Sequence, residues 1–337
     1  MIDLDEVGRT ALGVAYLRAY ESRRPNAVFV DPLALGLYGS AVVDDAGHLR
    51  ELPPADDEAG RERRAMYHSI VGRTLFLDEV FTTGAADGVR QFVILGAGLD
   101  ARAFRLDLGP DAVFYELDRP AVTEVKEQLV AEHSLVAHGQ RRVVSADLAG
   151  DWLTELRTAG FRPGEPTCWL AEGLLVYLDT DVVWQAIGAI TSASAAGSRI
   201  GLTVRLPGAR PPEDPFASVA SMWKPDPGIV DRLVASGWEC RSTDARTVLT
   251  AHGREILTPT GLQATSGATS RALLVSGVHP AVGNWLSDRT TNLEEWPTRR
   301  RTVPLPGRSR PNRGSTASAT HTAGSSMSAR PRASAHV

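Results

Sequence analysis

The segment Gln91-Phe-Val-Ile-Leu-Gly96-Ala-Gly98-Leu-Asp100-Ala-Arg102-Ala-Phe-Arg105 passes from a short apolar run through a glycine-rich turn into a helical pattern. This order is typical of the first strand, turn and helix of a parallel α/β sheet, where backbone N–H groups face a nucleotide-like ligand. Acidic residues recur near the ends of the next predicted strands, at Glu116, Asp118, Asp147 and Glu172. Four acids around one glycine turn favour a cofactor with hydroxyl groups and positive charge over one with a pyrophosphate.

Apolar runs and helical patterns alternate along most of the chain. This alternation predicts an α/β fold with right-handed crossovers: a doubly wound, mostly parallel seven-stranded sheet with helices on both faces. We expect helices over 119–133, 151–159, 180–195, 227–236 and 244–252. The expected strands are 92–95, 112–117, 142–145, 167–171, 199–205, 238–242 and 271–276.

The chain divides into three predicted parts. Residues 1–90 are mostly helical, with amphipathic patterns over 9–22 and 61–83, and are predicted to cover the sheet as an N-terminal helical cover. Residues 91–280 are predicted to form the ligand-binding core. Residues 281–337 are rich in Ser, Thr, Arg, Ala and Pro and show neither a period of 2 nor one of 3.6, so we expect a disordered tail.

Charge and composition limit the possible partners. The first 280 residues carry 27 basic and 37 acidic residues, a net charge of −10, which argues against nucleic acid as the main partner. The start of the chain lacks the pattern of a signal peptide, and no apolar stretch is long enough to span a membrane. Cys168 and Cys240 are interpreted as free thiols. We therefore expect a cytoplasmic protein without membrane or nucleic-acid partners.

The glycine turn also fits a dinucleotide fingerprint. Gly96, Gly98 and Ala101 match G-x-G-x-x-G/A, and Glu116 lies 20 residues beyond Gly96. An NAD(P)-dependent oxidoreductase is therefore an alternative. Against it, Asp100 inside the turn would repel phosphates unless a neighbouring arginine neutralises it. S-adenosyl-L-methionine avoids this conflict because it has no phosphate and carries a cationic sulfonium and ammonium.

Several segments together resemble the leucine carboxyl methyltransferase family, in particular its bacterial branch of S-adenosyl-L-methionine-dependent methyltransferases. The resemblance spans roughly residues 9–278 and preserves the order of the motifs. It implies that residues 91–280 form a class I methyltransferase-like Rossmann core that binds S-adenosyl-L-methionine. It is carried by Val93–Leu106, Glu116-Leu-Asp118-Arg-Pro120, Ala146-Asp147-Leu148, Trp169–Leu178, Thr10-Ala-Leu-Gly and Arg73-Thr-Leu-Phe-Leu-Asp78.

The resemblance implies which residues hold the ribose and the methionyl portion of the cofactor. Asp118 would accept hydrogen bonds from the ribose hydroxyls. Gly96, Ala97 and Gly98 would line the methionyl portion.

It also implies roles for residues from four other segments. Asp147 and the backbone of Leu148 would hold the adenine. Arg73 would pair with the cofactor carboxylate, a task suited to a bidentate guanidinium. Glu172 matches an acid near the cofactor amine, and Tyr177 matches a tyrosine that caps the pocket. Arg18, outside these motifs, is a looser candidate for a second basic residue.

The chemistry of the acceptor stays open. An acceptor carboxylate is already ionised near neutral pH and needs no general base, whereas an alcohol or phenol does. No catalytic residue is assigned: His68 is a possible base, but a plain surface histidine explains it better. The eight histidines and two cysteines form no pattern of metal ligands, so no metal is expected.

The methyl acceptor is predicted to bind between the N-terminal ninety residues and the irregular segment 206–227. A small metabolite or a peptide is expected as the acceptor, methylated on a carboxylate or hydroxyl. A non-catalytic nucleotide-binding protein with a degenerate methyltransferase fold is a further alternative. Candidate lining residues, each equally explained by core packing, are Tyr16, Tyr20, Met66, Phe216, Met222 and Trp223.

Overall fold

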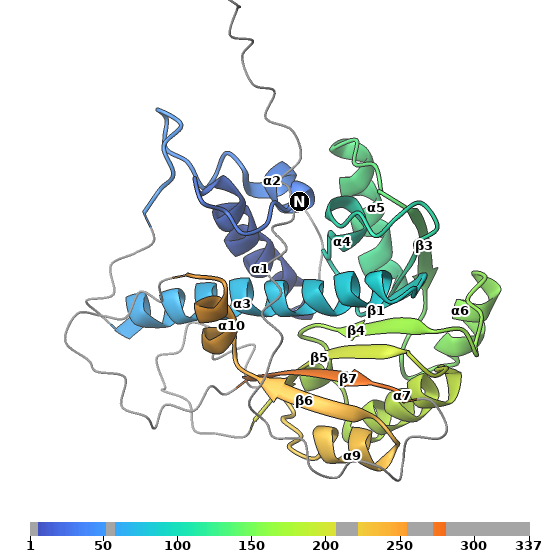
Figure 1. Ribbon diagram of the computed structural model, residues 1–337. Coiled ribbons are helices and arrows are strands. Elements are labelled where there is room, and N and C mark those ends of the chain that lie inside the picture. The colour runs from blue at the N-terminus through green and yellow to red at the C-terminus, as the bar shows by residue number, and fades with distance from the viewer. Residues whose placement is uncertain (1–5, 52–57, 207–221, 255–271, 281–337) are drawn as a thin grey trace, which may run out of the picture. The chain divides into compact units, whose positions relative to one another are not determined.

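The protein forms a seven-stranded sheet with helices on both faces; in Figure 1 the strands β1, β4, β5, β7 and β6 lie one below the other. The structure is a computed structural model that describes residues 6–51, 58–206, 222–254 and 272–280. The predicted tail 281–337 and part of the predicted acceptor segment therefore lie outside the described residues. The strands are β1 Gln91–Leu95, β2 Val113–Asp118, β3 Gln140–Ser145, β4 Thr167–Ala171, β5 Arg199–Arg205, β6 Glu239–Thr243 and β7 Ala272–Val278.

The strand order is β3-β2-β1-β4-β5-β7-β6. The first five strands pair in parallel, and β7 pairs antiparallel with both β5 and β6. The prediction of a mostly parallel seven-stranded sheet is confirmed, with these two antiparallel pairs added. The order reverses between β1 and β4, so the turns that follow these two strands flank the position where α/β sheets bind ligands.

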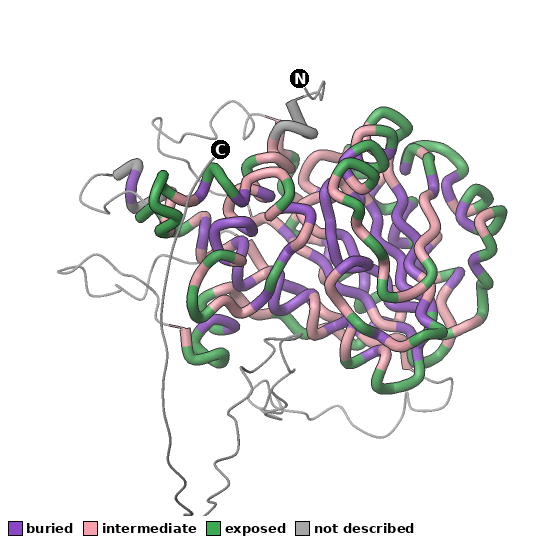
Figure 2. Tube along the Cα trace, turned by 90° about the horizontal axis from the view of Figure 1, so that it is seen from above, coloured by how far each residue is buried: buried purple, intermediate pink, exposed green. Residues whose placement is uncertain are grey.

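Alternate residues of each central strand pack into different cores. Phe92 and Ile94 of β1 belong to one cluster of buried side chains, and Val93 and Leu95 belong to the other. All five residues of β1 are buried, because both faces of the strand are covered. Figure 2 shows this concentration of buried residues within the sheet.

The two faces carry different helices. The cluster that contains Phe92 also draws residues from α1, α2, α3, α4, α5 and α10, whereas the cluster that contains Val93 draws them from α6, α7 and α9. The helices are α1 Glu6–Arg23, α2 Pro32–Tyr38, α3 Glu58–Ala86, α4 Arg102–Arg105, α5 Pro120–Glu132, α6 Trp152–Thr158, α7 Thr180–Ala193, α9 Ile229–Ala235 and α10 Ala245–Ala251, with the 3-10 turn η1 Leu175–Tyr177.

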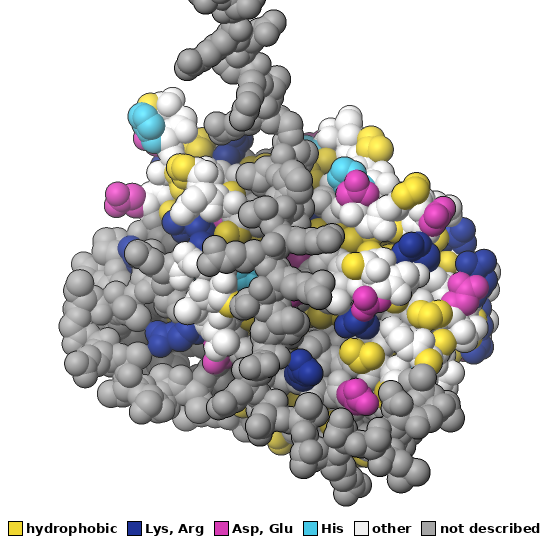
Figure 3. Space-filling view, viewed as in Figure 1, with side chains coloured by type: hydrophobic (Ala, Val, Ile, Leu, Met, Phe, Trp, Pro, Cys, Tyr) yellow, Lys and Arg dark blue, Asp and Glu magenta, His cyan; other side chains and the backbone are white. Residues whose placement is uncertain are grey.

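The long helix α3 lies directly on the sheet and also packs against α1 and α10. It therefore connects the N-terminal helices to the strands β4 and β5. Among the described residues, no helix is long and apolar enough to cross a membrane. Cys168 and Cys240 are both free, as predicted. On the face shown in Figure 3, the visible acidic and basic side chains of the described residues are interspersed.

Candidate functional site

The turn after β1 requires glycine at two positions. Gly96 and Gly98 have φ angles of +60° and +42°, in the left-handed region that L side chains rarely adopt. A Cβ atom at Gly96 would lie 2.6 Å from Cδ1 of Leu174, in the turn after β4. At Gly98, by contrast, the nearest side-chain atom is Cβ of Ala11 in α1, at 3.9 Å. The turn thus packs tightly at its base and leaves room in front of Gly98.

Asp118, the last residue of β2, faces this turn. Its Oδ2 accepts a hydrogen bond from the backbone N–H of Gly98 at 2.7 Å, and its Oδ1 accepts one from the N–H of Arg119 at 2.8 Å. Burial raises the pKa of the Asp118 carboxyl, although both amide bonds and two basic neighbours favour its ionised form. The structure therefore fixes a hydrogen-bond acceptor beside the glycine turn.

Glu116 lies elsewhere, and the expectation that it joins the acids around the turn is wrong. Its side chain is buried within the fold and its Oε2 accepts hydrogen bonds from Arg141 at 2.9 and 2.7 Å. Lys126 of α5 lies 2.7 Å from the same oxygen. The pairing explains why a mid-strand glutamate is tolerated: two cations compensate its burial. Glu116 is thus not placed to bind the ribose of a dinucleotide.

Asp147 and Leu148 follow β3, the neighbour of β2. The preceding Ala146 donates its N–H to the carbonyl oxygen of Asp118 at 2.9 Å, which ties this loop to the end of β2. Asp147 is exposed, and its Oδ1 accepts the N–H of Ala149 at 2.9 Å. Leu148 is buried. The loop therefore presents its backbone and one carboxylate on the β2 side of the turn.

Glu172 follows β4 and holds three arginines. Its Oε1 accepts hydrogen bonds from Nη2 of Arg18 at 2.5 Å and from Nε of Arg73 at 2.8 Å. Its Oε2 accepts one from Nη1 of Arg102 at 2.8 Å. The Glu172 side chain is only 6% exposed. Helices α1 and α3 are thereby attached to the end of β4 through one carboxylate.

Arg102 extends this cluster to two further acids. Its Nε donates to Asp78 of α3 at 2.8 Å, and its Nη1 also pairs with Asp100. Arg105 pairs with both carboxylate oxygens of Asp78. Because Arg102 neutralises Asp100, the expected repulsion between Asp100 and a phosphate is not supported. We call the whole cluster the carboxyl-edge network; its members are Arg18, Arg73, Asp78, Asp100, Arg102, Arg105 and Glu172.

Burial and charge act in opposite directions within the network. Burial disfavours the ionised form of Glu172, but Arg18, Arg102 and Arg73 outweigh it and hold the pKa of this carboxyl well below its usual range. For Arg73, burial lowers the pKa of the guanidinium, and the nearby Arg18 and Arg102 lower it further against the effect of Glu172. A second carboxylate beside Arg73 would therefore be electrostatically favoured.

The sequence of the chain matches one known family over more than half its length. The leucine carboxyl methyltransferase family profile matches residues 11–191. The chain belongs to this family. The match runs from within α1 to within α7 and includes all four strand ends described above, so the predicted resemblance is confirmed.

Relatives of this methyltransferase family member come from actinobacteria. A Streptomyces avermitilis protein named "Putative S-adenosyl-L-methionine-dependent methyltransferase/SAV474" is 42% identical over 75% of this chain and 90% of its own length. A Frankia alni protein named "Putative S-adenosyl-L-methionine-dependent methyltransferase FRAAL3718" is 40% identical over 82% of this chain and 96% of its own length. Among solved structures, that of human N-acetylserotonin methyltransferase aligns with 82% of this chain over 94% of its own length, with 11% identity and a TM-score of 0.39.

Other expected site residues of this family member have less distinctive surroundings. Tyr177 ends η1 and is partly exposed. Tyr16 and Tyr20 stack edge-on against Tyr38 and Tyr67, as core packing predicts. Phe216 lies outside the described residues. Within the described ranges, no group of three or more His, Cys, Asp or Glu side chains is arranged to hold a metal ion.

Sequence reasoning missed the centre of the carboxyl-edge network. Arg102 has a fully buried side chain and contacts three acids, whereas the sequence indicates only that an arginine near Asp100 could neutralise it. The one available signal was its position two residues after Asp100. Nothing in the sequence pairs Asp78 with Arg102 and Arg105, because these residues lie 24 and 27 positions apart.

Proposed function

We propose that this family member transfers a methyl group from S-adenosyl-L-methionine to an oxygen of a small molecule or peptide. One observation carries the proposal: Asp118 is fixed beside the open glycine turn by the N–H of Gly98, at the point where the strand order reverses. A carboxylate in this position is a good acceptor for ribose hydroxyls. The family match and the names of the relatives support the same cofactor.

The residues at this edge fit S-adenosyl-L-methionine in shape and charge. A Cβ atom at Gly98 would project into the free space beside the turn, so glycine keeps that space available to the methionyl portion. We assign the neighbouring Gly96 and Ala97 to the same part of the cofactor. Asp118 supplies the ribose contact through its carboxylate.

The remaining contacts are assigned from the family motifs. Asp147 and the backbone of Leu148 would bind the adenine, and Tyr177 would cap the pocket. Arg73 would pair with the cofactor carboxylate through its terminal nitrogens, and its position is set by the hydrogen bond from its Nε to Glu172. Glu172 would thus position Arg73 as well as lie near the cofactor amine.

We further propose that residues 1–90 cover the cofactor bound by the core 91–280. Ala11 of α1 lies near Gly98, and both Arg18 of α1 and Arg73 of α3 reach Glu172. These contacts place the two helices beside the glycine turn. Helices over the turn would exclude water, which strengthens electrostatic contacts inside the site.

When bound, the cofactor supplies an electrophilic methyl group on a sulfonium. The protein's task is then to align an acceptor oxygen with that methyl group in a dry site. We propose a carboxylate as the acceptor, because it reacts in its ionised form and needs no general base. The carboxylates of Asp118 and Glu172 at this edge already accept hydrogen bonds from Gly98 and from three arginines, so the proposal assigns neither of them as a base.

The linkage formed in the product tests the acceptor class. The purified protein is incubated with methyl-labelled S-adenosyl-L-methionine and a panel of metabolite and peptide acids, each matched with its alcohol. We expect label to be transferred to an acid and released as methanol by mild base, because methyl esters hydrolyse and methyl ethers do not. Transfer to an alcohol as a base-stable product would contradict the carboxylate proposal but retain methyl transfer.

A further inference from the structure

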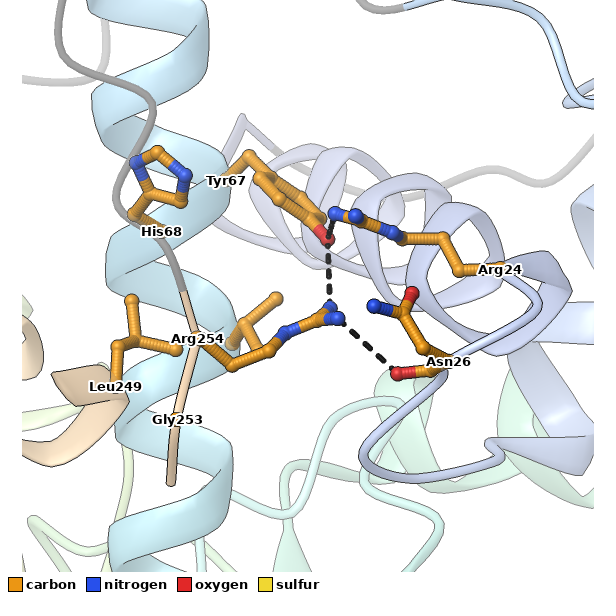
Figure 4. A pocket seen from close by; sticks show the side chains of 8 residues that line it. Arg24, Asn26, Tyr67, His68, Leu249, Gly253 and Arg254 are labelled. Atoms are coloured by element: carbon orange, nitrogen blue, oxygen red, sulfur yellow. Dashed lines mark hydrogen bonds between the residues drawn. The ribbon is translucent and has the colours of Figure 1, made fainter. Parts of the chain in front are cut away.

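A second cluster of charged side chains surrounds a cavity away from the carboxyl edge. The cavity has a volume of about 310 Å³ and lies between the end of α1, the first half of α3 and α10 (Figure 4). It shares no residue with the proposed cofactor site. Its lining residues are Arg24, Asn26, Tyr67, His68, Val71, Leu249, Gly253 and Arg254.

Arg254 is held rigidly at one wall. Its Nη1 donates to the carbonyl oxygen of Asn26 at 3.1 Å, and its Nη2 donates to Oε1 of Glu21 at 2.6 Å. Glu21 is fully buried, and its oxygens also accept the N–H of Val28 and the hydroxyl of Tyr67. Glu21 therefore lies behind the wall, where its carboxylate fixes Arg254 and Tyr67.

Arg24 is held by a hydroxyl group and not by a described carboxylate. Its Nη1 donates to the hydroxyl oxygen of Tyr67 at 2.8 Å, and Figure 4 shows the guanidinium directed at that hydroxyl. Arg24 forms no ion pair with any carboxylate in the part of the chain that the structure describes. Burial raises the pKa of the Tyr67 phenol, so the hydroxyl is neutral. Burial acts to lower the pKa of the Arg24 guanidinium, but the hydrogen bond to Tyr67 and the charge of Glu21 outweigh it and raise that pKa.

The pKa of His68 depends on its burial and on the arginines around the cavity. Burial lowers the pKa of its imidazole to about 4, and the charges of Arg24, Arg64, Arg254 and Arg246 add to this effect. These arginines come from the end of α1, from α3, from α10 and from the segment after α10. Among the described residues, the four arginines that act on His68 thus outnumber Glu21, the acid that pairs with Arg254. At neutral pH the imidazole is neutral and can donate one hydrogen bond.

The other side of the cavity is apolar. Val71 of α3 and Leu249 of α10 line it together with the backbone of Gly253. On α3, Tyr67 and His68 precede Arg73 by five or six residues, or about 7–9 Å along the helix axis. The cavity therefore lies near the carboxyl edge, yet it combines a cationic wall with an apolar one.

We propose that this cavity is a binding pocket for a small molecule that carries one anionic group, a carboxylate or phosphate, on an apolar body. Arg24 would bind the anion, Arg254 would contribute its fixed charge, and His68 would donate a hydrogen bond. Val71 and Leu249 would contact the apolar body. The volume is at the lower end of the range for ligand pockets, which suits a ligand the size of a single substituted ring. We call this site the anion pocket.

The anion pocket is tested by calorimetric titration of the full chain with phenyl phosphate at neutral pH, and with phenol as the uncharged comparison. We expect phenyl phosphate to bind and phenol to bind much more weakly. Arg24→Gln should weaken phenyl phosphate by roughly tenfold or more, since a charge-assisted hydrogen bond is lost. The control Arg241→Gln changes an exposed arginine of β6 and should bind as the wild type does.

Two further measurements separate this pocket from other sites. Bound phenyl phosphate should raise the pKa of His68, followed by NMR with its signal assigned from a His68→Gln variant, because the anion offsets the arginines. Saturating S-adenosyl-L-homocysteine should not displace phenyl phosphate. Absence of binding, equal affinity in Arg24→Gln, an unchanged His68 pKa or displacement by S-adenosyl-L-homocysteine would each overturn the proposal. None of these results depends on methyl transfer.

Discussion

Two arginine clusters lie side by side along α1 and α3, and they differ in how their charge is balanced. In the carboxyl-edge network, each arginine pairs with an acid, and Glu172 alone holds Arg18, Arg73 and Arg102. In the anion pocket, Arg24 forms no such pair with a described carboxylate. The same residue type therefore serves two purposes: the balanced cluster fixes helices to strand ends, whereas the unbalanced one leaves a cationic cavity.

The largest expected effect separates the two clusters by stability. Arg102→Met would leave Asp78, Asp100 and Glu172 without their shared cation, in a site where Arg102 itself is fully buried. Breaking a buried ion pair typically costs about 3–5 kcal/mol, and we expect a loss of this size in urea unfolding.

The control for this experiment is Arg157→Met, at an exposed position of α6. It should change the free energy of unfolding by less than about 0.5 kcal/mol, as surface substitutions usually do. A loss of under about 1 kcal/mol in Arg102→Met would show that the network does not hold the strand ends together.

The next effect concerns cofactor binding at the open side of the network. Asp118→Ala removes the proposed acceptor of the ribose hydroxyls, so the affinity for S-adenosyl-L-methionine should fall by about 1–3 kcal/mol. Asp111→Ala, at an exposed loop position, is the matched control and should bind normally. Calorimetry measures both. Unchanged affinity in Asp118→Ala with an intact unfolding transition would remove Asp118 from the site.

The affinity for the cofactor should also depend on pH through Asp118. Burial raises the pKa of this carboxyl above the ordinary aspartate value. Its ionised form accepts hydrogen bonds, so affinity should be full at neutral pH and should fall as the pH drops through the raised pKa. The step should be absent in Asp118→Ala. A step of equal size in that variant would assign it to another group.

The smallest expected effect sharpens the contrast between the clusters. Arg24→Gln removes a guanidinium that is only partly buried and that donates to a hydroxyl group and not to a described carboxylate. We therefore expect its free energy of unfolding to stay within about 0.5 kcal/mol of the wild type. A loss close to that of Arg102→Met would mean that Arg24 is structural, and the two clusters would no longer differ.

Sequence patterns located the strands well because the parallel strands are buried on both faces. The predicted ranges 167–171 and 199–205 agree with β4 and β5 residue by residue. Such strands appear as continuous apolar runs between turn residues, which is a local signal. The sequence does not predict that β7 lies between β5 and β6, because the residues of a strand do not indicate which distant strand it pairs with.

The site was predicted only in part, for a related reason. Glu116 and Asp118 are two residues apart on the same strand, and the sequence alone predicts that both carboxylates lie beside the glycine turn. Their different roles follow from partners elsewhere: Arg141 and Lys126 engage Glu116, whereas the turn at Gly98 engages Asp118. Contacts of this kind form only when the chain is folded.

Calorimetric titration of the purified protein with S-adenosyl-L-methionine, S-adenosyl-L-homocysteine and NADH in parallel tests the central claim most directly. The account predicts that the first two bind at one site with micromolar affinity, on the order of −8 kcal/mol, and that NADH does not bind. Binding of NADH without either sulfur compound would contradict the assignment of Asp118 and the glycine turn to S-adenosyl-L-methionine.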